Sequence, residues 1–360
     1  MKKALRIFFI ITNTLIVAAL LLSSIAGWVP PSKCVWISFL SYGFFPLVIL
    51  NILCSLLWLF FKRWEFLISL IAILLRCTMI PLFIQVGGNS EPPVSESRSA
   101  AEEFKVMSYN LHGFHGKTEA GSDYCENAAR FVDAVRLTTP DVICAQEMHH
   151  SKTYSVTDSL IALGYIHIYS TQKAGRYPYG ATIFSRHKFE YVHTIDESGR
   201  KIYADIQKDD FKVRVVCVHM SSYAFGHTHH DVLQDIKHKD IDTANTRRLF
   251  SKIKKNVLNH EYEWNNDLAE VVKDRPLPLI VAGDFNDTPA SHLYHKISHQ
   301  LNDSYVEEGS GLGITYNDPF PTYRIDYIFH SKELNTLAYR RLVSDFSDHN
   351  GIVAVFEIKQ

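Results

Sequence analysis

The first 88 residues almost lack acidic side chains and contain no histidine. Glu65 is the one acid in this stretch, against seven lysines and arginines, so its net charge is +6. The rest of the chain carries 30 basic and 37 acidic residues, a net charge of −7, and the overall value of −1 conceals the difference. The acidic part lacks the broad basic surface that nucleic-acid binding usually needs. A local basic stripe is present at Lys237, Lys239, Arg247, Arg248, Lys252, Lys254 and Lys255.

Cysteine motifs are also missing. The six cysteines include no CxxC pair and no Cys/His spacing typical of zinc. Cys144 and Cys217 lie inside apolar runs, where a small buried thiol is the usual explanation. The sequence therefore indicates neither a disulfide framework nor a common structural zinc site.

Long hydrophobic runs are confined to the first part of the chain. Three of them, roughly 4–28, 35–61 and 66–86, reach about the 20 residues that cross a bilayer. The first run lacks a small-residue cleavage site before Pro30 and Pro31, which argues against a removable signal peptide. We therefore predict three transmembrane helices within residues 1–88. A helical domain buried inside a soluble protein is the alternative.

Basic residues predict the orientation of these helices. Lys2, Lys3 and Arg6 precede the first run, Lys62 and Arg63 separate the second from the third, and only Lys33 lies in the other loop. By the positive-inside rule the N-terminus is cytoplasmic. We expect a multi-pass protein of the cell (inner) membrane whose remaining residues are extracytoplasmic: a Gly/Pro/Ser-rich linker over 89–103 and one large domain over 104–360.

Polar residues follow several predicted strands of this domain. Leu279 to Ala282 and Gly283 predict an interior strand that stops at a sheet edge, with Asp284 and Asn286 on one face just beyond. Other apolar runs end in the same way, at Asn110, Glu147, His219, and Asp348 with His349, while Asp326 lies within a further strand. A surface acid, a core histidine or a turn explains each one singly. Together they indicate strand ends that converge on one site.

The ordered segments SYNLHG, ICAQEM, CVHMSS, GDFND, RIDYIF and SDHNG resemble the motifs of the endonuclease/exonuclease/phosphatase superfamily. The resemblance covers about residues 104–358. It implies an α/β fold, a four-layered α/β/β/α sandwich of the DNase I-like type, and magnesium-dependent hydrolysis of a phosphoester. With the predicted spans, the chain looks like a membrane-anchored, bacterial-type member.

The residue types agree with this chemistry. Mg²⁺ prefers hard oxygen ligands, so Glu147 is the best metal ligand, with Asn110 completing the site and Asp348 nearby. Mn²⁺ is an alternative ion. Asn110 also has the position of a phosphate contact.

The resemblance implies a further set of catalytic roles. His349 is a candidate general base oriented by Asp326, and Asp284 is the alternative base. Asn286 would hold the phosphate or the water, and His219 would contact phosphate or protonate the leaving oxygen. In DNase I-like members a glutamate on the preceding strand orients this histidine, whereas residues 201–205 here contain no glutamate.

Three functions stay open at this stage. The first is a membrane-tethered phosphodiesterase or phosphatase acting on a lipid head group or a small molecule. The second is a nuclease acting on extracytoplasmic DNA or RNA, and the third is a non-catalytic binding module on a membrane anchor. We expect a phosphoester and the lipid bilayer as partners, and no obligate protein partner is evident. Residues His227 to His230 are expected to form a flexible loop beside the site, with metal binding as the alternative.

Overall fold

The computed structural model describes residues 3–91, 103–116, 123–149, 151, 153–171, 180–222, 243–317 and 322–358. The contacts within the chain divide it into two compact units. The smaller unit comprises Met1–Phe83, Ser221–Glu263 and Asp287–Lys296, and the larger comprises Ile84–Met220, Trp264–Asn286 and Ile297–Gln360. The boundaries expected at residues 88 and 103 stay predictions. Most of the expected linker, Lys237, Lys239 and residues 227–230 lie outside the described residues.

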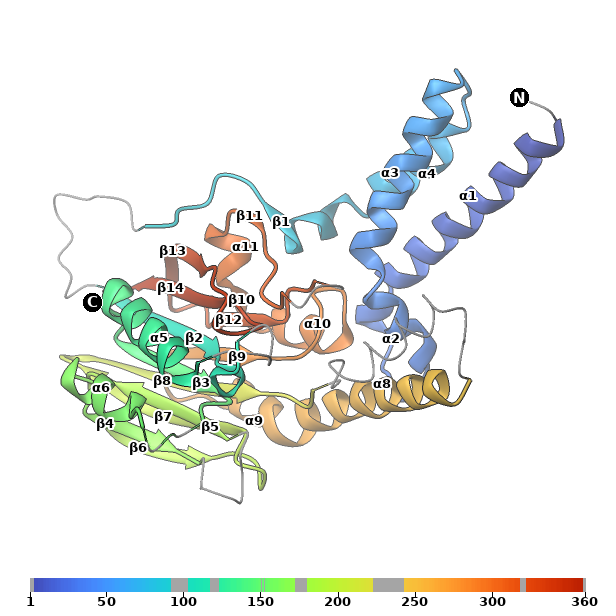
Figure 1. Cartoon of the computed structure of the whole chain (residues 1–360). Coiled ribbons are helices and arrows are strands. Elements are labelled where there is room, and N and C mark those ends of the chain that lie inside the picture. Colours follow the sequence, from blue (N-terminus) through green and yellow to red (C-terminus); the bar gives the residue numbers. More distant parts are fainter. Residues whose placement is uncertain are drawn as a thin grey trace. The chain divides into compact units, whose positions relative to one another are not determined.

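The larger unit contains two six-stranded mixed sheets (Figure 1). The first has the order β13 (Asn335–Leu342), β14 (Gly351–Glu357), β2 (Glu103–Asn110), β3 (Val142–Gln146), β5 (Ala181–Ser185) and β4 (His167–Ser170). The second has the order β10 (Asn302–Asp303), β12 (Asp326–His330), β9 (Leu279–Asp284), β8 (Phe211–His219), β7 (Lys201–Lys208) and β6 (Lys188–Thr194). The predicted mixed α/β class with two sheets is confirmed.

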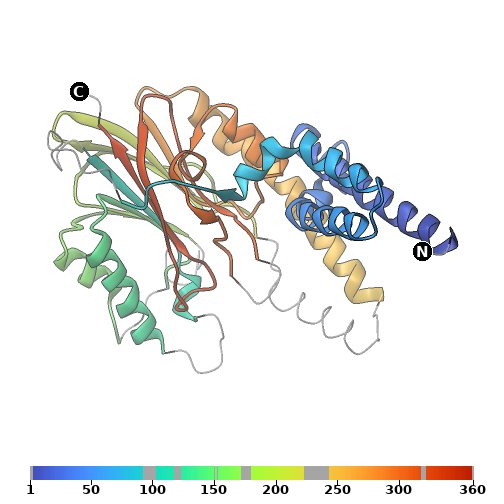
Figure 2. The same ribbon diagram turned by 90° about the horizontal axis from the view of Figure 1, so that it is seen from above.

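A shared apolar core lies between the two sheets. Val106 and Cys144 of the first sheet pack with Cys217, Ile280 and Ala282 of the second, and all five are fully buried. Strands that are apolar throughout require cover on both faces. On the outer face of the first sheet that cover comes from the helix α5 (Tyr124–Thr138), which Figure 2 shows alongside β2.

Several shorter elements complete the chain. In the larger unit they are β1 (Ile84–Gln85), η4 (His112–Phe114), α6 (Val156–Ala162), η5 (Trp264–Leu268), α9 (Ala269–Lys273), α11 (Ser304–Glu308) and β11 (Gly311–Leu312). The helix α10 (His292–Ser298) begins in the smaller unit.

The strand directions bring six chain segments to one edge of the sheets. Strands β2 and β3 are parallel, with Asn110 opposite Gln146, and β8 and β9 are parallel, with His219 opposite Asp284. Parallel neighbours end at the same edge of a sheet. Strand β14 runs antiparallel to β2, and β12 runs antiparallel to β9, so both begin where those strands end. This topology places the polar residues that follow or precede these strands together.

The smaller unit is helical. It contains α1 (Lys3–Ser24), η1 (Ala26–Trp28), α2 (Val35–Ser41), α3 (Phe44–Phe60), α4 (Phe66–Leu75), η2 (Cys77–Leu82) and α8 (Thr243–Glu263). Inside the N-terminal helices, Ser69 donates a hydrogen bond to Asn13 at 2.6 Å, and Arg6 is hydrogen-bonded to the buried Glu65 at 2.6 Å. Many large apolar side chains of the same helices point outward.

The prediction of three transmembrane helices is wrong for the described residues. One helical stretch, Lys3–Trp28, is long and apolar enough to cross a membrane, and Val35–Ser41 with Phe44–Phe60 qualifies only as a pair bent by 65°. The third run forms a helix of 10 residues. A proline lies near each break: Pro46, in the first turn of α3, has no N–H for the Tyr42 carbonyl, and Pro81 lies in the 3-10 turn beyond Arg76.

Candidate active site

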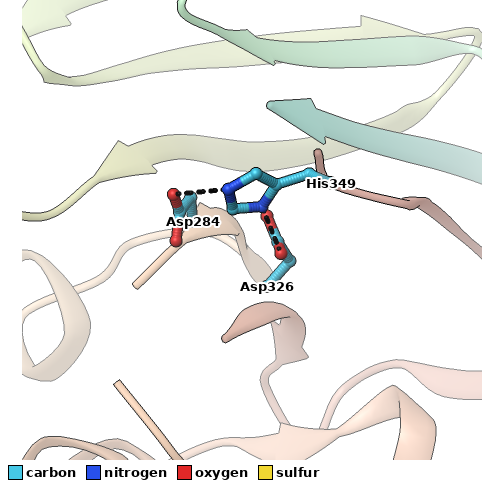
Figure 3. A group of neighbouring side chains, drawn as sticks. All are labelled: Asp284, Asp326 and His349. Carbon is cyan, nitrogen blue, oxygen red and sulfur yellow. Dashed lines mark hydrogen bonds and ion pairs between the residues drawn. The ribbon is translucent and has the colours of Figure 1, made fainter. Parts of the chain in front are cut away.

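A buried histidine–carboxylate pair lies at the shared edge of the sheets. His349 Nδ1 is 2.9 Å from Asp326 Oδ2, and His349 Nε2 is 3.8 Å from Asp284 Oδ2 (Figure 3). Asp326 and Asp284 face each other across the antiparallel strands β12 and β9. Because Asp326 accepts from Nδ1, the neutral ring would leave its Nε2 lone pair toward Asp284. The imidazole is thereby fixed in orientation, as a general base or a phosphate contact requires.

A second group surrounds Glu147. His219 Nε2 lies 3.3 Å from Glu147 Oε1 and 4.0 Å from Asp284 Oδ2. The Asn110 amide nitrogen lies 3.4 Å from Glu147 Oε1 and donates to Asp284 Oδ2 at 3.0 Å. Asn110 therefore stands between two carboxylates that come from different sheets.

Asn286 is committed to the catalytic carboxylate candidate rather than free for a phosphate. Its backbone N–H donates to Asp284 Oδ1 at 2.8 Å, and its amide nitrogen donates to Asp284 Oδ2 at 3.1 Å and to the Met220 carbonyl at 3.2 Å. The expected phosphate contact from Asn286 would require these bonds to change. In this structure Asn286 orients Asp284.

Unusual backbone conformations support this arrangement. Glu147 and Asn286 have φ angles of 51° and 50°, a left-handed region that costs free energy for residues with a side chain. Gly283 has φ 153°, and a Cβ there would lie 1.9 Å from the Val218 carbonyl oxygen. Only glycine lets β8 and β9 approach this closely, so the glycine of the GDFND segment sets the spacing between His219 and Asp284.

The carboxylates perturb one another and the histidines. Burial and the neighbouring Asp326 raise the pKa of Asp284 to about 6, despite the opposing effects of His349, His219 and Asn110. Burial lowers the pKa of His349, but Asp326, Asp284 and Asp348 outweigh it and raise that pKa well above its usual value. At neutral pH these shifts favour an ionised Asp284 beside a protonated His349.

Glu147 has the opposite shift. Burial acts to raise the pKa of Glu147, but the hydrogen bond and charge of His219, with His112 and His349, lower it to about 2. For His219, burial acts to lower the pKa, but Glu147 and Asp284 outweigh it, so the pKa of His219 is raised above its usual value. Glu147 is therefore an anion at any working pH, which suits a metal ligand.

Asp348 lies at the rim of this cluster. Its Oδ1 is 3.4 Å from His112 Nδ1, and its side chain is 17% exposed. Its expected place near a metal stays a prediction. The strand before His219 carries Lys201, whose amine lies 3.1 Å from Asp267.

Sequence reasoning missed several supporting residues. The Ser347 hydroxyl donates to the Asn110 carbonyl at 2.8 Å and accepts from the His349 N–H at 3.1 Å, joining two site segments. The Thr315 hydroxyl accepts from the N–H groups of Ile325 and Asp326, both at 3.0 Å. Ser347 lies in the SDHNG segment, where its position before Asp348 was the available signal. Thr315 has no comparable signal in the sequence.

Comparison with known families decides the assignment. A model of the Endonuclease/Exonuclease/phosphatase family matches residues 107–349. The chain belongs to this family. Its members are hydrolytic phosphoesterases or nucleases and generally depend on a divalent metal. A second model, described as a domain of unknown function, matches residues 6–83.

Solved structures of other proteins are similar to this chain at low sequence identity. An endonuclease/exonuclease/phosphatase from Beutenbergia cavernae is 20% identical, with a TM-score of 0.48 over 71% of this chain and 72% of that one. Truncated TDP2 from Caenorhabditis elegans is 18% identical, with a TM-score of 0.49 over 71% and 98%. The human Nocturnin catalytic domain is 19% identical, with a TM-score of 0.48 over 72% and 95%. No curated protein matches the chain significantly.

The side chains present fit the divalent cation on which the family generally depends. The Asn110 amide nitrogen lies between Glu147 and Asp284, while its oxygen accepts from the His112 N–H at 3.1 Å. A half-turn of the amide would give up that bond and present the oxygen to a cation. Two carboxylates and an amide oxygen are hard donors of the kind that Mg²⁺ and Mn²⁺ prefer. Asp284, Asp326 and His349 also bring ligand atoms within 4.8 Å of one another.

Proposed function

We propose that this chain is a membrane-tethered, magnesium-dependent phosphoester hydrolase that acts on a phosphoester at the membrane surface. The observation that supports it best is the His349–Asp326 pair with Asp284 3.8 Å from His349 Nε2, next to Glu147 and Asn110. This arrangement combines an oriented imidazole, a carboxylate with a pKa near neutrality and an anionic metal ligand in one buried cluster.

Asp284 accepts the proton of the attacking water in this proposal. Its pKa of about 6 places it near the optimum for a general base at neutral pH. Hydrogen bonds from Asn110 and Asn286 hold both of its oxygens in position. The raised pKa of His349 argues against that residue as the base, because a protonated imidazole has no lone pair to offer.

His349 and His219 bind the phosphoryl oxygens. Both histidines favour the protonated form, and a positive charge beside a phosphate stabilises the negative charge that develops during attack. Asp326 holds His349 through Nδ1, which leaves Nε2–H to donate to the substrate. Glu147 and Asn110 would hold a Mg²⁺ ion, which when bound polarises a phosphoryl oxygen.

The exposure pattern of the N-terminal helices supports membrane attachment. Leu15 is 66% exposed and Phe60 is 79% exposed, while Asn13, Asn51 and Ser69 are at most 2% exposed. Soluble proteins bury their apolar side chains, whereas helices in lipid expose them and bury polar ones. We propose that Lys3–Trp28 is a membrane anchor. One span with a cytoplasmic N-terminus places the catalytic unit outside the cytoplasm, and a second span formed by the bent pair would reverse this.

A substrate panel tests the proposed activity. The full chain in detergent is assayed with Mg²⁺ on plasmid DNA, RNA, phospholipids, inositol phosphates and a generic phosphodiester, each with and without EDTA. We expect EDTA-sensitive hydrolysis of a lipid head-group phosphoester, and preference for DNA or RNA would favour the nuclease instead. Glu147→Gln should be inactive and the exposed Glu126→Gln fully active. Equal rates for Glu147→Gln and wild type would remove the enzymatic function and leave a binding module.

A reporter fused after Gln360 tests the topology. A reporter active only outside the cytoplasm should give signal if α1 is the single span. Signal from a cytoplasmic reporter would show that the bent pair also crosses the membrane. A soluble, evenly distributed fusion would contradict the anchor itself.

A further inference from the structure

A largely buried hydrogen-bonded network in the smaller unit connects the N-terminal helices with Asp287, the residue after Asn286. The Tyr42 hydroxyl, at the end of α2, donates to Asp287 Oδ1 at 2.7 Å. His260 of α8 contacts the same carboxylate, with Nδ1 3.2 Å from Oδ2. Asp287 directly follows Asn286 in the sequence. Both contacts therefore hold the residue that directly follows Asn286 of the proposed active site.

Helix α8 holds the chain after His219 in the same way. His260 Nε2 lies 2.7 Å from the Ser221 carbonyl, and Glu263 accepts from the Ser221 N–H at 3.2 Å and from its hydroxyl at 3.0 Å. Ser221 is two residues beyond His219. Helix α8 therefore forms hydrogen bonds to the segments just beyond both His219 and Asn286.

His260 can form both of these hydrogen bonds in only one protonation state. Its two ring nitrogens face a carboxylate and a carbonyl, which both accept hydrogen bonds, so the ring can satisfy both only when it is protonated. Burial lowers the pKa of His260, but Asp287 and Glu263 outweigh it and raise that pKa. His260, Asp287 and Glu263 are each at most 5% exposed. A buried charge set of this kind tolerates little change in geometry.

Further contacts tie the N-terminal part to α8 and to the segment after Asp287. The Ser32 N–H and hydroxyl each donate to the Glu261 carboxylate at 2.8 Å. His292 Nδ1 lies 2.8 Å from the Gly27 carbonyl. The stretch from Gly27 to Tyr42 is therefore bound both to α8 and to the chain after Asp287.

We propose that Tyr42, His260 and Asp287 are positioning residues for hydrolysis, which fix the chain segments that follow Asn286 and His219. The inference rests on the proposed function. None of the three touches the reacting atoms; they act through the backbone next to residues that do. A displacement of about 1 Å at a reacting group can cost about 10²-fold in rate, so the support of these segments matters. The N-terminal helices then support catalysis in addition to anchoring the chain.

A single hydroxyl deletion gives the sharpest test. In the full chain, Tyr42→Phe keeps the ring and removes the bond to Asp287, and Tyr165→Phe is the matched control, because that buried hydroxyl donates to the Pro140 carbonyl at 2.6 Å. We expect Tyr42→Phe to lower kcat by about 3- to 30-fold with KM nearly unchanged. Tyr165→Phe should keep the wild-type kcat. Wild-type kcat in Tyr42→Phe would overturn the proposal.

A double-mutant cycle tests whether the residues act as one network. Asp287→Asn keeps an oxygen that accepts from Tyr42, so it should retain more activity than Asp287→Ala. Adding Tyr42→Phe to Asp287→Ala should cost no further kcat, because the partner is already gone. If the kcat losses of the two single variants multiplied in the double variant, Tyr42 and Asp287 would act independently, and the proposed network would be overturned.

Hydrogen exchange separates this inference from the proposed function. The peptide spanning 284–291 is followed without substrate or metal; it contains the Thr288 N–H, which donates to Asp287 Oδ1 at 3.0 Å. We expect faster exchange in Tyr42→Phe than in wild type and Tyr165→Phe. If exchange is faster in Tyr42→Phe but the wild-type protein hydrolyses no phosphoester, the network is supported and the proposed hydrolase function is rejected. Unchanged exchange in an active enzyme would reject the network alone.

Discussion

The N-terminal helices and the two-sheet unit differ most in the side chains that they expose. Between the sheets the core is apolar, with Val106, Cys217 and Ile280 fully buried, and polar groups gather at one edge. In the N-terminal helices the interior holds apolar residues such as Phe44 as well as polar ones such as Asn13, while many other large apolar side chains are exposed. This difference in exposure agrees with the proposed membrane attachment of the N-terminal helices.

Buried polar residues have different uses in the two regions. Ser69 donates to the Asn13 side-chain oxygen at 2.6 Å, a contact between α1 and α4 that stabilises helix packing. Asp284 and Asp326 are instead placed side by side, where like charges disfavour ionisation. A protein accepts that cost where chemistry needs it. The difference predicts that a change of Asp284 should alter activity, whereas a change of the contact between Asn13 and Ser69 should alter stability alone.

The largest expected effect comes from Asp284→Asn. The amide cannot accept the proton of water, so we expect the rate to fall by about 10²–10⁴-fold, the usual contribution of a general base. The same change removes a buried negative charge, so the metal-free protein should gain about 1–3 kcal/mol in free energy of unfolding. Activity assays measure the loss of rate, and thermal unfolding measures the gain in stability. Loss of stability together with activity would contradict the assignment of Asp284 as a strained catalytic group.

The second test compares two exposed leucines, one on the proposed membrane anchor and one on a surface in water. Leu15 of α1 is 66% exposed and Leu137 of α5 is 84% exposed. In a bilayer Leu15→Lys should cost about 2.5–3.5 kcal/mol of insertion free energy, whereas Leu137→Lys on an aqueous surface should change stability by at most about 0.5 kcal/mol. Membrane fractionation and unfolding measure these. Equal tolerance of both lysines would mean that α1 faces water.

The pH dependence of hydrolysis is the third test. Asp284 must be ionised to act as the base, so activity should fall as the pH drops through its pKa of about 6, by about tenfold between pH 7 and 5. His349 must stay protonated, so a second fall is expected as the pH rises through its raised pKa. Asp284→Asn should lose the acid limb. A rate that keeps rising below pH 6 would exclude Asp284 as the base.

The sequence predicted the two-sheet unit better than the helices. Strand β9 and the β7–β8 hairpin were predictable, because apolar runs ended by Gly283 or interrupted by Asp209 carry local signals. The break at Gly43 and the short α4 were missed, since hydropathy registers apolar length but not where a helix bends. The grouping of α8 with the N-terminal helices depends on contacts such as Ser32 with Glu261, which no local pattern encodes.

The candidate site was predictable in residue type but not in detailed contact. The ordered motifs indicated Asp326 beside His349, and the structure places them 2.9 Å apart, while the roles assigned to them stay proposals. The use of Asn286 to orient Asp284 could not be predicted, because an amide can donate or accept in many directions. The network through Tyr42 and His260 was likewise invisible, since those residues are more than 200 positions apart in the chain.

The smallest expected effect concerns the polar interior of the helices. Asn13→Ala and Ser69→Ala, singly and together, measure the coupling between α1 and α4. In a membrane such pairs contribute on average about 0.6 kcal/mol, less than a comparable hydrogen-bond deletion that leaves a buried group unpaired in a water-soluble core. Hydrolysis by the inserted enzyme should be unchanged, in contrast to Asp284→Asn. A fall in kcat without loss of stability would show that the contact between α1 and α4 also serves the active site, as proposed for Tyr42, and that its role is not limited to helix packing.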